Sequence, residues 1–349
     1  MNDIIKFDIR SALLPEITQF IENLGEKPYR AKQIYEWLHK KGAEEFNEMT
    51  NLPLTLRKKL EEVTKIPRIE VSHIQTSVDG TRKYLMELFE GNKSVYIESV
   101  LMEYQHGLSI CLSSQVGCSM GCDFCASGIT GLERNLTTGE ILGQLYKISK
   151  LENKRITNIV IMGSGEPLDN YDNVINFIKI INDENGYNIG QRHITLSTCG
   201  ITPKIYKLLE ENLQITLAIS LHAPNDNIRK KIMKIAKVYT LDGLLKACRL
   251  YAKKRRVTFE YIMLDGINDS VENAKELASK IKEINCHINL IPVNKVKGKP
   301  YSRSCDKTIN NFAKILENSG IEVTIRRELG ADIDAACGQL RNKKLSEGI

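Results

Sequence analysis

Residues 108–125, LSICLSSQVGCSMGCDFC, carry an apolar run typical of a buried strand and, directly after it, three cysteines. From there to the C-terminus, short β-branched and apolar runs alternate with stretches of helical period. Such alternation is typical of βα units that form a parallel sheet. We therefore predict an α/β fold, a partial barrel of the (β/α)6 type with ligands at the C-terminal ends of its strands. The candidate strands are residues 108–114, 158–163, 193–198, 215–221, 257–264, 288–293 and 322–327.

Two shorter regions precede this core, which we place at residues 105–349. Residues 1–65 contain three helical patterns and equal numbers of basic and acidic residues, 11 of each, and we predict a small helical accessory domain. Contact with RNA through clusters such as Lys40 and Lys41 is the alternative to a purely structural role. Residues 66–104 alternate in polarity and contain the turn signals Asp79-Gly80 and Gly91-Asn92, which predicts a β-rich linker.

The composition excludes several classes of protein. The chain has 349 residues, 42% of them hydrophobic and 26% charged, with a net charge of +6; these values are normal for a globular protein of about two domains. No apolar run approaches the ~20 residues of a membrane span, and the N-terminus lacks the pattern of a secretory signal. We therefore expect a cytoplasmic protein with no membrane partner. In that reducing compartment the nine cysteines favour metal binding or catalysis over structural disulfides.

Cys118, Cys122 and Cys125 have the spacing CxxxCxxC. A structural zinc site usually has four ligands, often in two CxxC-type pairs, and a simple ferredoxin cluster also has four cysteines. Three thiolates instead leave one iron of a 4Fe–4S cluster open, and S-adenosylmethionine (SAM) can chelate such an iron through its amino and carboxylate groups. A zinc site or a group of buried thiols is the alternative without redox chemistry.

The cysteine spacing, its place after the first strand of the core and the aromatic Phe124 before the last cysteine resemble the radical SAM superfamily. This resemblance implies a 4Fe–4S cluster on the three cysteines and SAM as its ligand. Residues 162–167, MGSGEP, are similar to the glycine–glutamate–proline motif of the superfamily. Taken singly, such residues at strand ends are turn or cap residues. With the cysteine motif, they become candidate SAM contacts, and these are Gly165, Glu166, Ser197, Ser220, Leu221, His222 and Asn294.

A narrower resemblance covers almost the whole chain. It rests on the segments PYRAKQIYEW, CLSSQVGCSMGCDFC, MGSGEPLDN, STCGI, SLHAPND, INLIPVN and DIDAACGQL. In combination these segments resemble the RlmN/Cfr family of RNA adenosine methyltransferases. Residues 326–340, RRELGADIDAACGQL, are closer to the RlmN members, which methylate C2 of adenine. Methylation at C8, as in the Cfr type, is the nearest alternative.

The family resemblance implies roles for three further residues. A first SAM methylates Cys337, and a radical derived from a second SAM takes a hydrogen from that methyl group. The resulting carbon radical adds to C2 of adenine and leaves a protein–RNA adduct. Glu98 then accepts the C2 proton, and Cys111 attacks the sulfur of Cys337, which releases the RNA and leaves a 111–337 disulfide. Without the resemblance, the two cysteines are interpreted as buried thiols and Glu98 as a surface carboxylate of a strand.

Local charge indicates the partner. Residues 226–257 hold eleven Lys and Arg residues against two acidic residues, a footprint of phosphate binding, although a solvated helix face explains part of it. The target base must be extruded or unpaired to enter the barrel. By resemblance the substrates are 23S rRNA and tRNA, the electron donor is a protein such as flavodoxin or ferredoxin, and the enzyme is a monomer. A non-catalytic Fe–S or zinc RNA-binding protein is the alternative from another class.

Overall fold

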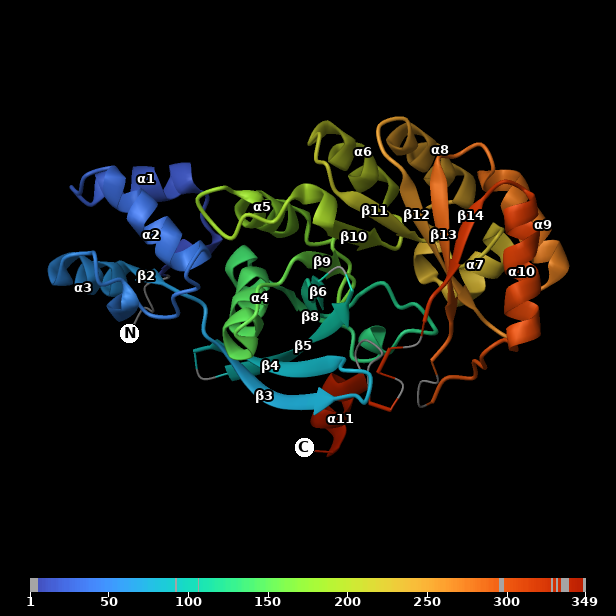
Figure 1. Ribbon diagram of the computed structural model, residues 1–349, viewed down its shortest axis with the longest axis horizontal. Helices are drawn as coiled ribbons and strands as arrows, with labels where there is room; N and C mark the ends of the chain where they lie inside the picture. The colour runs from blue at the N-terminus through green and yellow to red at the C-terminus, as the bar shows by residue number, and fades with distance from the viewer. Residues whose placement is uncertain are drawn as a thin grey trace.

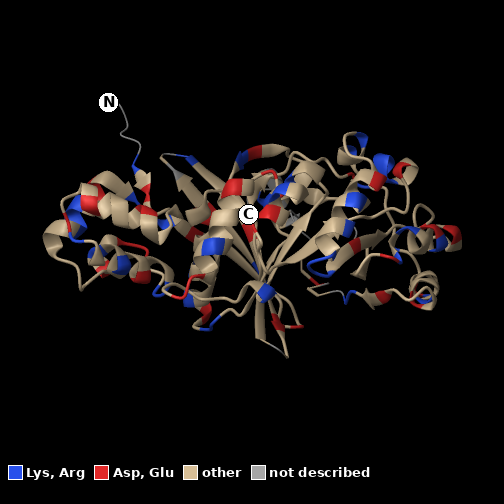
Figure 2. Ribbon diagram, turned by 90° about the horizontal axis from the view of Figure 1, so that it is seen from above, with Lys and Arg blue, Asp and Glu red and all other residues tan. Residues whose placement is uncertain are grey.

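The computed structural model describes residues 6–91, 93–105, 107–294, 298–327, 329–330, 332–333 and 339–347 (Figure 1). Cys337 lies outside these residues. In the described part of the chain, no helix is both long and apolar enough to cross a membrane. Figure 2 shows basic and acidic residues interspersed on the helices, whereas the strands at the centre are mostly uncharged.

A ten-stranded sheet forms the centre of the molecule, in the order β14-β13-β12-β11-β10-β9-β6-β5-β4-β3. All the pairings from β6 to β14 are parallel, and this confirms the predicted α/β fold. The sheet is open because β3 and β14 are its edges. The parallel strands are β6 (Gly107–Cys111), β9 (Asn158–Ile161), β10 (Ile194–Thr198), β11 (Thr216–Ser220), β12 (Val257–Met263), β13 (Cys286–Pro292) and β14 (Glu322–Ile325).

Helices connect consecutive parallel strands. Most of them turn an apolar stripe towards the sheet, as in α10, which buries Ile309, Phe312, Ala313 and Leu316, whereas α7 buries Arg229 and Ile232. The spacing of these four residues puts them on one helix face, and burial of each larger side chain contributes about 1.5–3 kcal/mol. The helices are α4 (Thr138–Glu152), α5 (Tyr171–Asn182), α6 (Thr202–Glu210), α7 (Asp226–Ile232), α8 (Leu241–Ala252), α9 (Val271–Ile281) and α10 (Asp306–Asn318). Helices α6 and α7 are the shortest of this set, with nine and seven residues.

Residues 66–104 form the predicted strands, and these strands extend the central sheet. They are β3 (Ile69–Thr76), β4 (Arg82–Glu90) and β5 (Lys93–Tyr104). The three strands are antiparallel, and β5 pairs with β6 from Val100 opposite Cys111 to Tyr104 opposite Gly107. A second small sheet, of β7 (Gln115–Gly117) and β8 (Leu132–Asn135), flanks the cysteine loop. The last helix, α11 (Gln339–Glu347), packs against β5 (Figure 1).

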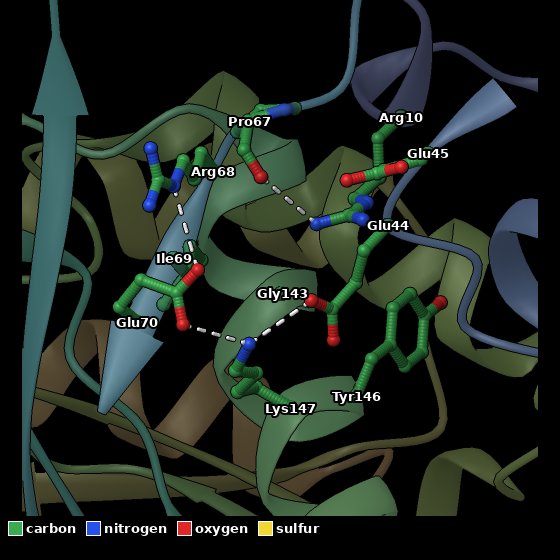
Figure 3. A pocket seen from close by; sticks show the side chains of 10 residues that line it. All are labelled: Arg10, Glu44, Glu45, Pro67, Arg68, Ile69, Glu70, Gly143, Tyr146 and Lys147. Atoms are coloured by element: carbon green, nitrogen blue, oxygen red, sulfur yellow. Dashed lines mark hydrogen bonds and ion pairs between the residues drawn. The ribbon is translucent and has the colours of Figure 1, made fainter. Parts of the chain in front are cut away.

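The N-terminal region contains the three predicted helices, α1 (Leu14–Asn23), α2 (Tyr29–His39) and α3 (Leu54–Val63). The short strands β1 (Phe7–Asp8) and β2 (Thr64–Lys65) pair and close the region. Buried Arg10 lies at its junction with the core and donates to the carbonyls of Ala43 at 2.9 Å and Pro67 at 3.2 Å. Beside it, Lys147 of α4 bridges Glu44 and Glu70 (Figure 3). These polar contacts hold the region against α4, and the division into separate domains stays a prediction.

Candidate active site

A cavity lies between the cysteine loop and the C-terminal ends of β9, β10 and β11, and we call it the cysteine cavity. The loop follows β7 and is tied to α7 because the Asp123 amide donates to the Ile232 carbonyl at 2.9 Å. Such strand ends are where α/β sheets bind ligands. The cavity brings together eight of the residues predicted from the sequence, which are Cys118, Cys122, Cys125, Gly165, Glu166, Ser197, Ser220 and His222.

Burial opposes the ionisation of two thiols of the loop, those of Cys118 and Cys122. Burial raises the pKa of Cys118 to about 12, against a hydrogen bond from the Met120 backbone and with a smaller contribution from the charge of Cys125. Burial and the charge of Cys125 raise the pKa of Cys122 as well. A cationic group would reverse this effect, because metal binding displaces thiol protons. Within the described residues, no three His, Cys, Asp or Glu side chains converge as around a single ion. The donor set, three soft thiols on one loop, fits an iron–sulfur cluster with three protein ligands.

Glu166 is fixed at the end of β9 by its backbone neighbours. Its Oε2 accepts from the Cys199 amide at 2.7 Å, and its Oε1 accepts from the Leu168 amide at 3.0 Å. Burial raises the pKa of this carboxyl, and the hydrogen bond from Cys199 opposes the rise. Gly165 before it has φ +107°, and a Cβ there would meet the Gln115 side chain at 2.6 Å. Only glycine therefore allows the turn that presents Glu166 to the cavity.

His222 lines the cavity in an uncommon backbone conformation for a non-glycine residue, with φ +58°. Its Nδ1 accepts from the Ile262 amide at 3.0 Å, so the ring proton of the neutral form is on Nε2. Burial, with the nearby Arg229 charge, lowers the pKa of His222 to about 3. The ring meets Phe124 edge to face at 5.0 Å. The cavity therefore has a neutral imidazole held from two sides.

Two predicted SAM contacts, Leu221 and Asn294, are not among the residues that line the cysteine cavity. The Leu221 side chain is fully buried, and only its backbone, whose amide donates to the Glu260 carbonyl at 3.0 Å, is at the strand end. Asn294 follows β13 at the same edge of the sheet and is exposed, but it is not among the residues that line the cysteine cavity. Their roles as SAM contacts stay predictions.

Glu98 and Cys111 share the inner face of the sheet. Cys111 is opposite Val100 on β5, and Glu98 is two residues from Val100 on the same strand, so their side chains point to the same side. Glu98 is 3% exposed and pairs with buried Lys83 at 3.0 Å. The interpretation of Glu98 as a surface carboxylate is therefore wrong. The carboxylate also accepts from the Arg341 amide of α11 at 2.6 Å.

The segment that carries Cys337 is anchored on both sides by described residues. Before it, Asp332 accepts from the Ser77 hydroxyl and, at 3.1 Å, from the Val78 amide. The Gly330 amide donates to Asp79 at 2.8 Å. After it, Arg341 reaches Glu98 as described above. The turn between β3 and β4 and the strand β5 therefore hold the two flanks of this segment, across more than 240 residues of sequence.

The basic stretch 226–257 is divided between two places. Arg229 is fully buried, and its guanidinium donates to the carbonyls of Cys199 at 2.7 Å and Leu221 at 3.2 Å. Arg229 therefore holds two strand ends together beside the cysteine cavity. The sequence did not reveal this role, because Arg229 lies among exposed lysines in the chain. Residues 253–256 precede β12 and lie at the N-terminal edge of the parallel strands, opposite the cavity. There Arg256 pairs with Glu322 at 2.5 Å.

Comparisons with known proteins agree with this geometry. Residues 112–278 match the family model of the radical SAM superfamily, and residues 9–66 match that of the ribosomal RNA large subunit methyltransferase N-terminal domain. The chain is 52% identical to the "probable dual-specificity RNA methyltransferase RlmN" of Lachnospira eligens, over 97% of both chains. It is 53% identical to the protein of the same description from Clostridium novyi, over 98% of both.

A solved structure has the same fold. The crystal structure of a radical SAM methyltransferase from Sphaerobacter thermophilus superposes with a TM-score of 0.90 at 40% identity, over 95% of this chain and 98% of that one. Similarity at this level, over nearly the full length, extends beyond the superfamily core to the N-terminal region and the C-terminal segment. The chain belongs to the RlmN family of dual-specificity RNA methyltransferases, within the radical SAM superfamily.

Proposed function

We propose that this enzyme methylates C2 of adenosine in 23S rRNA and in tRNA, and that Cys337 carries the methyl group. The observation that supports the proposal most is the cysteine cavity, where three thiols face Glu166, Ser197, Ser220 and His222. C2 is an electron-poor ring carbon without a nucleophilic lone pair, so ordinary transfer from SAM has no nucleophile there. A radical route avoids this barrier.

The residues of the chain have separate tasks in this proposal. Cys118, Cys122 and Cys125 hold the 4Fe–4S cluster, which supplies the electron that cleaves SAM. Glu166 and the serines at the ends of β10 and β11 bind the polar groups of SAM, and His222 offers an Nε2–H donor. These groups lie on strand ends fixed by Arg229 and by backbone hydrogen bonds, which orients SAM before the reaction.

Glu98, Cys111 and Cys337 act on the RNA side. Cys337 presents its S-methyl group to C2. Glu98 accepts the C2 proton, and its contacts with Lys83 and the Arg341 amide hold the carboxylate in place. One electron also leaves the radical adduct, for which the oxidised cluster would be the acceptor. The Cys111 thiolate then forms the bond to the sulfur of Cys337, the bond between that sulfur and the methylene carbon breaks with its electron pair left on carbon, and that carbon takes a proton to become the methyl group. The shared inner face of β5 and β6 supports a common role for Glu98 and Cys111.

The remaining partners follow from this assignment. The reaction requires a reduced protein donor such as flavodoxin or ferredoxin, and the RNA substrates place the enzyme in the cytoplasm. We propose that it acts as a monomer. The N-terminal region 1–65 is proposed to assist RNA binding as a separate domain, because it lies at one end of the molecule, next to α4 and α5 (Figure 1).

The proposed function is tested directly with the wild-type enzyme. After anaerobic iron reconstitution, incubation with SAM, a reductant and an rRNA fragment or tRNA is expected to yield 2-methyladenosine from both RNAs. Mass spectrometry of the nucleosides, with chromatographic standards for the C2 and C8 isomers, is the measurement. Formation of 8-methyladenosine would assign the enzyme to the Cfr type. A protein that binds the RNA and yields neither isomer would contradict the proposal.

Loss of the anchor at Asp332 is expected to slow methyl transfer. In Asp332→Ala the contacts to Ser77 and Val78 are lost, and the hydrogen bond from the Gly330 amide to Asp79 is left to hold this flank of the Cys337 segment. Misplacement of a reacting group by about 1 Å can lower a rate by about a hundredfold, and we expect a fall of about tenfold or more. SAM cleavage without RNA reports on the cysteine cavity and is expected to stay near the wild-type rate. Asp265→Asn, a change at an exposed residue, is the control, and equal methylation by both variants would contradict the anchoring role.

A further inference from the structure

A second cavity lies beside the cysteine cavity on the inner face of the sheet, and we call it the lumen cavity. Its volume is about 730 Å³, within the ~300–1,000 Å³ of small-molecule sites. Met162 lines both cavities, so they are neighbours. Threonines from four strands form much of the wall of the lumen cavity, together with Glu260 and Asn289.

Glu260 is a buried acid with unused hydrogen-bonding capacity. It is 4% exposed, and its Oε1 accepts from Asn289 Nδ2 at 2.9 Å. Its Oε2 is buried and has no hydrogen-bond partner among the described residues. A buried polar atom without a partner is unfavourable, and one that lines a cavity indicates a ligand that completes it. Burial raises the pKa of Glu260, whereas Asn289 and the charge of Arg326 oppose the rise and favour the carboxylate.

The sheet register places Glu260 next to a residue of the proposed SAM site. In the sheet register, Ser220 lies opposite Glu260, Glu260 opposite Asn289, and Asn289 opposite Thr324. These four residues form one row across β11 to β14. Because Ser220 also lines the cysteine cavity, a ligand that contacts Glu260 lies directly beside the proposed SAM site.

The target base fits this place. For methylation, C2 of adenine must face the methyl carrier, so the edge with the 6-amino group and N7 is free to contact the protein. Polar side chains commonly read that edge. We propose that the lumen cavity binds the extruded adenine of the RNA substrate and that Glu260 Oε2 accepts a hydrogen bond from its 6-amino group. This inference rests on the proposed function and adds the residue that selects the base.

Two features of the cavity wall support the assignment. Arg326 and Arg327 line the cavity and are exposed, so they can contact phosphates that flank an extruded base. Leu329 also lines the cavity, three residues before anchored Asp332, which brings the chain that leads to Cys337 along this wall. The charge of Arg326 near Glu260 disfavours a metal cation as the occupant.

The test compares two RNAs that have adenosine or inosine at the target position. Both bases carry a hydrogen at C2, but inosine has a carbonyl oxygen where adenosine has the amino group. A carboxylate at residue 260 favours adenosine, whereas an amide can donate to the inosine carbonyl. In Glu260→Gln we expect the ratio of kcat/KM for adenosine to that for inosine to fall by about tenfold or more, as for a single base contact. A merely structural role would lower both values together.

Further variants make the outcome decisive. Glu317→Gln, the same change on the exposed side of α10, is expected to keep the wild-type ratio. Glu260→Thr, which continues the threonine wall, removes the carboxylate and leaves a shorter hydroxyl that can also donate. It is expected to lower the ratio as well, so the test stands if the glutamine variant does not fold. An unchanged ratio in folded Glu260 variants would overturn the inference and leave the proposed function intact. A wild-type enzyme that methylates neither RNA would instead contradict the proposed function.

Discussion

Cys337→Ala is expected to form neither methylated RNA nor a protein–RNA adduct, whereas Cys111→Ala is expected to accumulate the adduct. The asymmetry follows from the order of events, since one thiol acts before the carbon–carbon bond forms and the other acts after it. Without Cys337 there is no sulfur to carry the methyl group. Without Cys111 no thiolate attacks that sulfur, so the bond between the Cys337 sulfur and the methylene carbon persists.

Denaturing gels and mass spectrometry of the peptide around Cys337 measure both results. The adduct is expected to survive denaturant and high salt, which separates it from RNA held by charge. Cys305→Ala, a substitution of an exposed cysteine, is the matched control and is expected to turn over like the wild type. If both Cys337→Ala and Cys111→Ala are inactive and free of adduct, Cys111 is a packing residue or an earlier base, and the disulfide step is wrong.

Substitution of any one of Cys118, Cys122 and Cys125 by serine is expected to abolish SAM cleavage. Each variant replaces a soft thiolate by a hard hydroxyl that binds iron weakly. The wild type is expected to hold about four irons per chain after anaerobic reconstitution, and each variant is expected to hold far less. Iron and sulfide assays and the visible absorption of the cluster are the measurements, with SAM cleavage followed in the absence of RNA.

Cys199→Ser is the control for this series, because Cys199 lines the same cavity. Its backbone amide and its thiol both hydrogen-bond to Glu166, and a serine hydroxyl can keep both contacts. We expect this variant to retain iron and SAM cleavage. Loss of iron in Cys199→Ser to the extent of the other three would indicate a fourth cysteine ligand and no open iron. One zinc per chain and no iron in the anaerobic wild type would contradict the cluster altogether.

The sequence by itself determined the elements of the core and the chemical identity of the cysteine loop. Strands such as β12 and helices such as α10 were readable because their signal, an apolar period of two or about 3.6 residues, is local. The spacing CxxxCxxC is local as well. Parallel pairing then followed from the alternation of strands and helices, and it placed Glu166, Ser197, Ser220 and His222 at one edge of the sheet.

Only the tertiary structure decided which residues that are far apart in the sequence contact one another. It buried Glu98 against Lys83, and it joined Asp332 to the turn at Ser77. It separated Arg229, which is buried beside the cysteine cavity, from the basic residues 253–256 at the opposite edge. Among the described residues, it also left Glu260 Oε2 without a hydrogen-bond partner. These properties depend on sheet register and on packing between distant segments. A local sequence pattern does not encode them, because the same residues give the same pattern on a buried and on an exposed strand or helix.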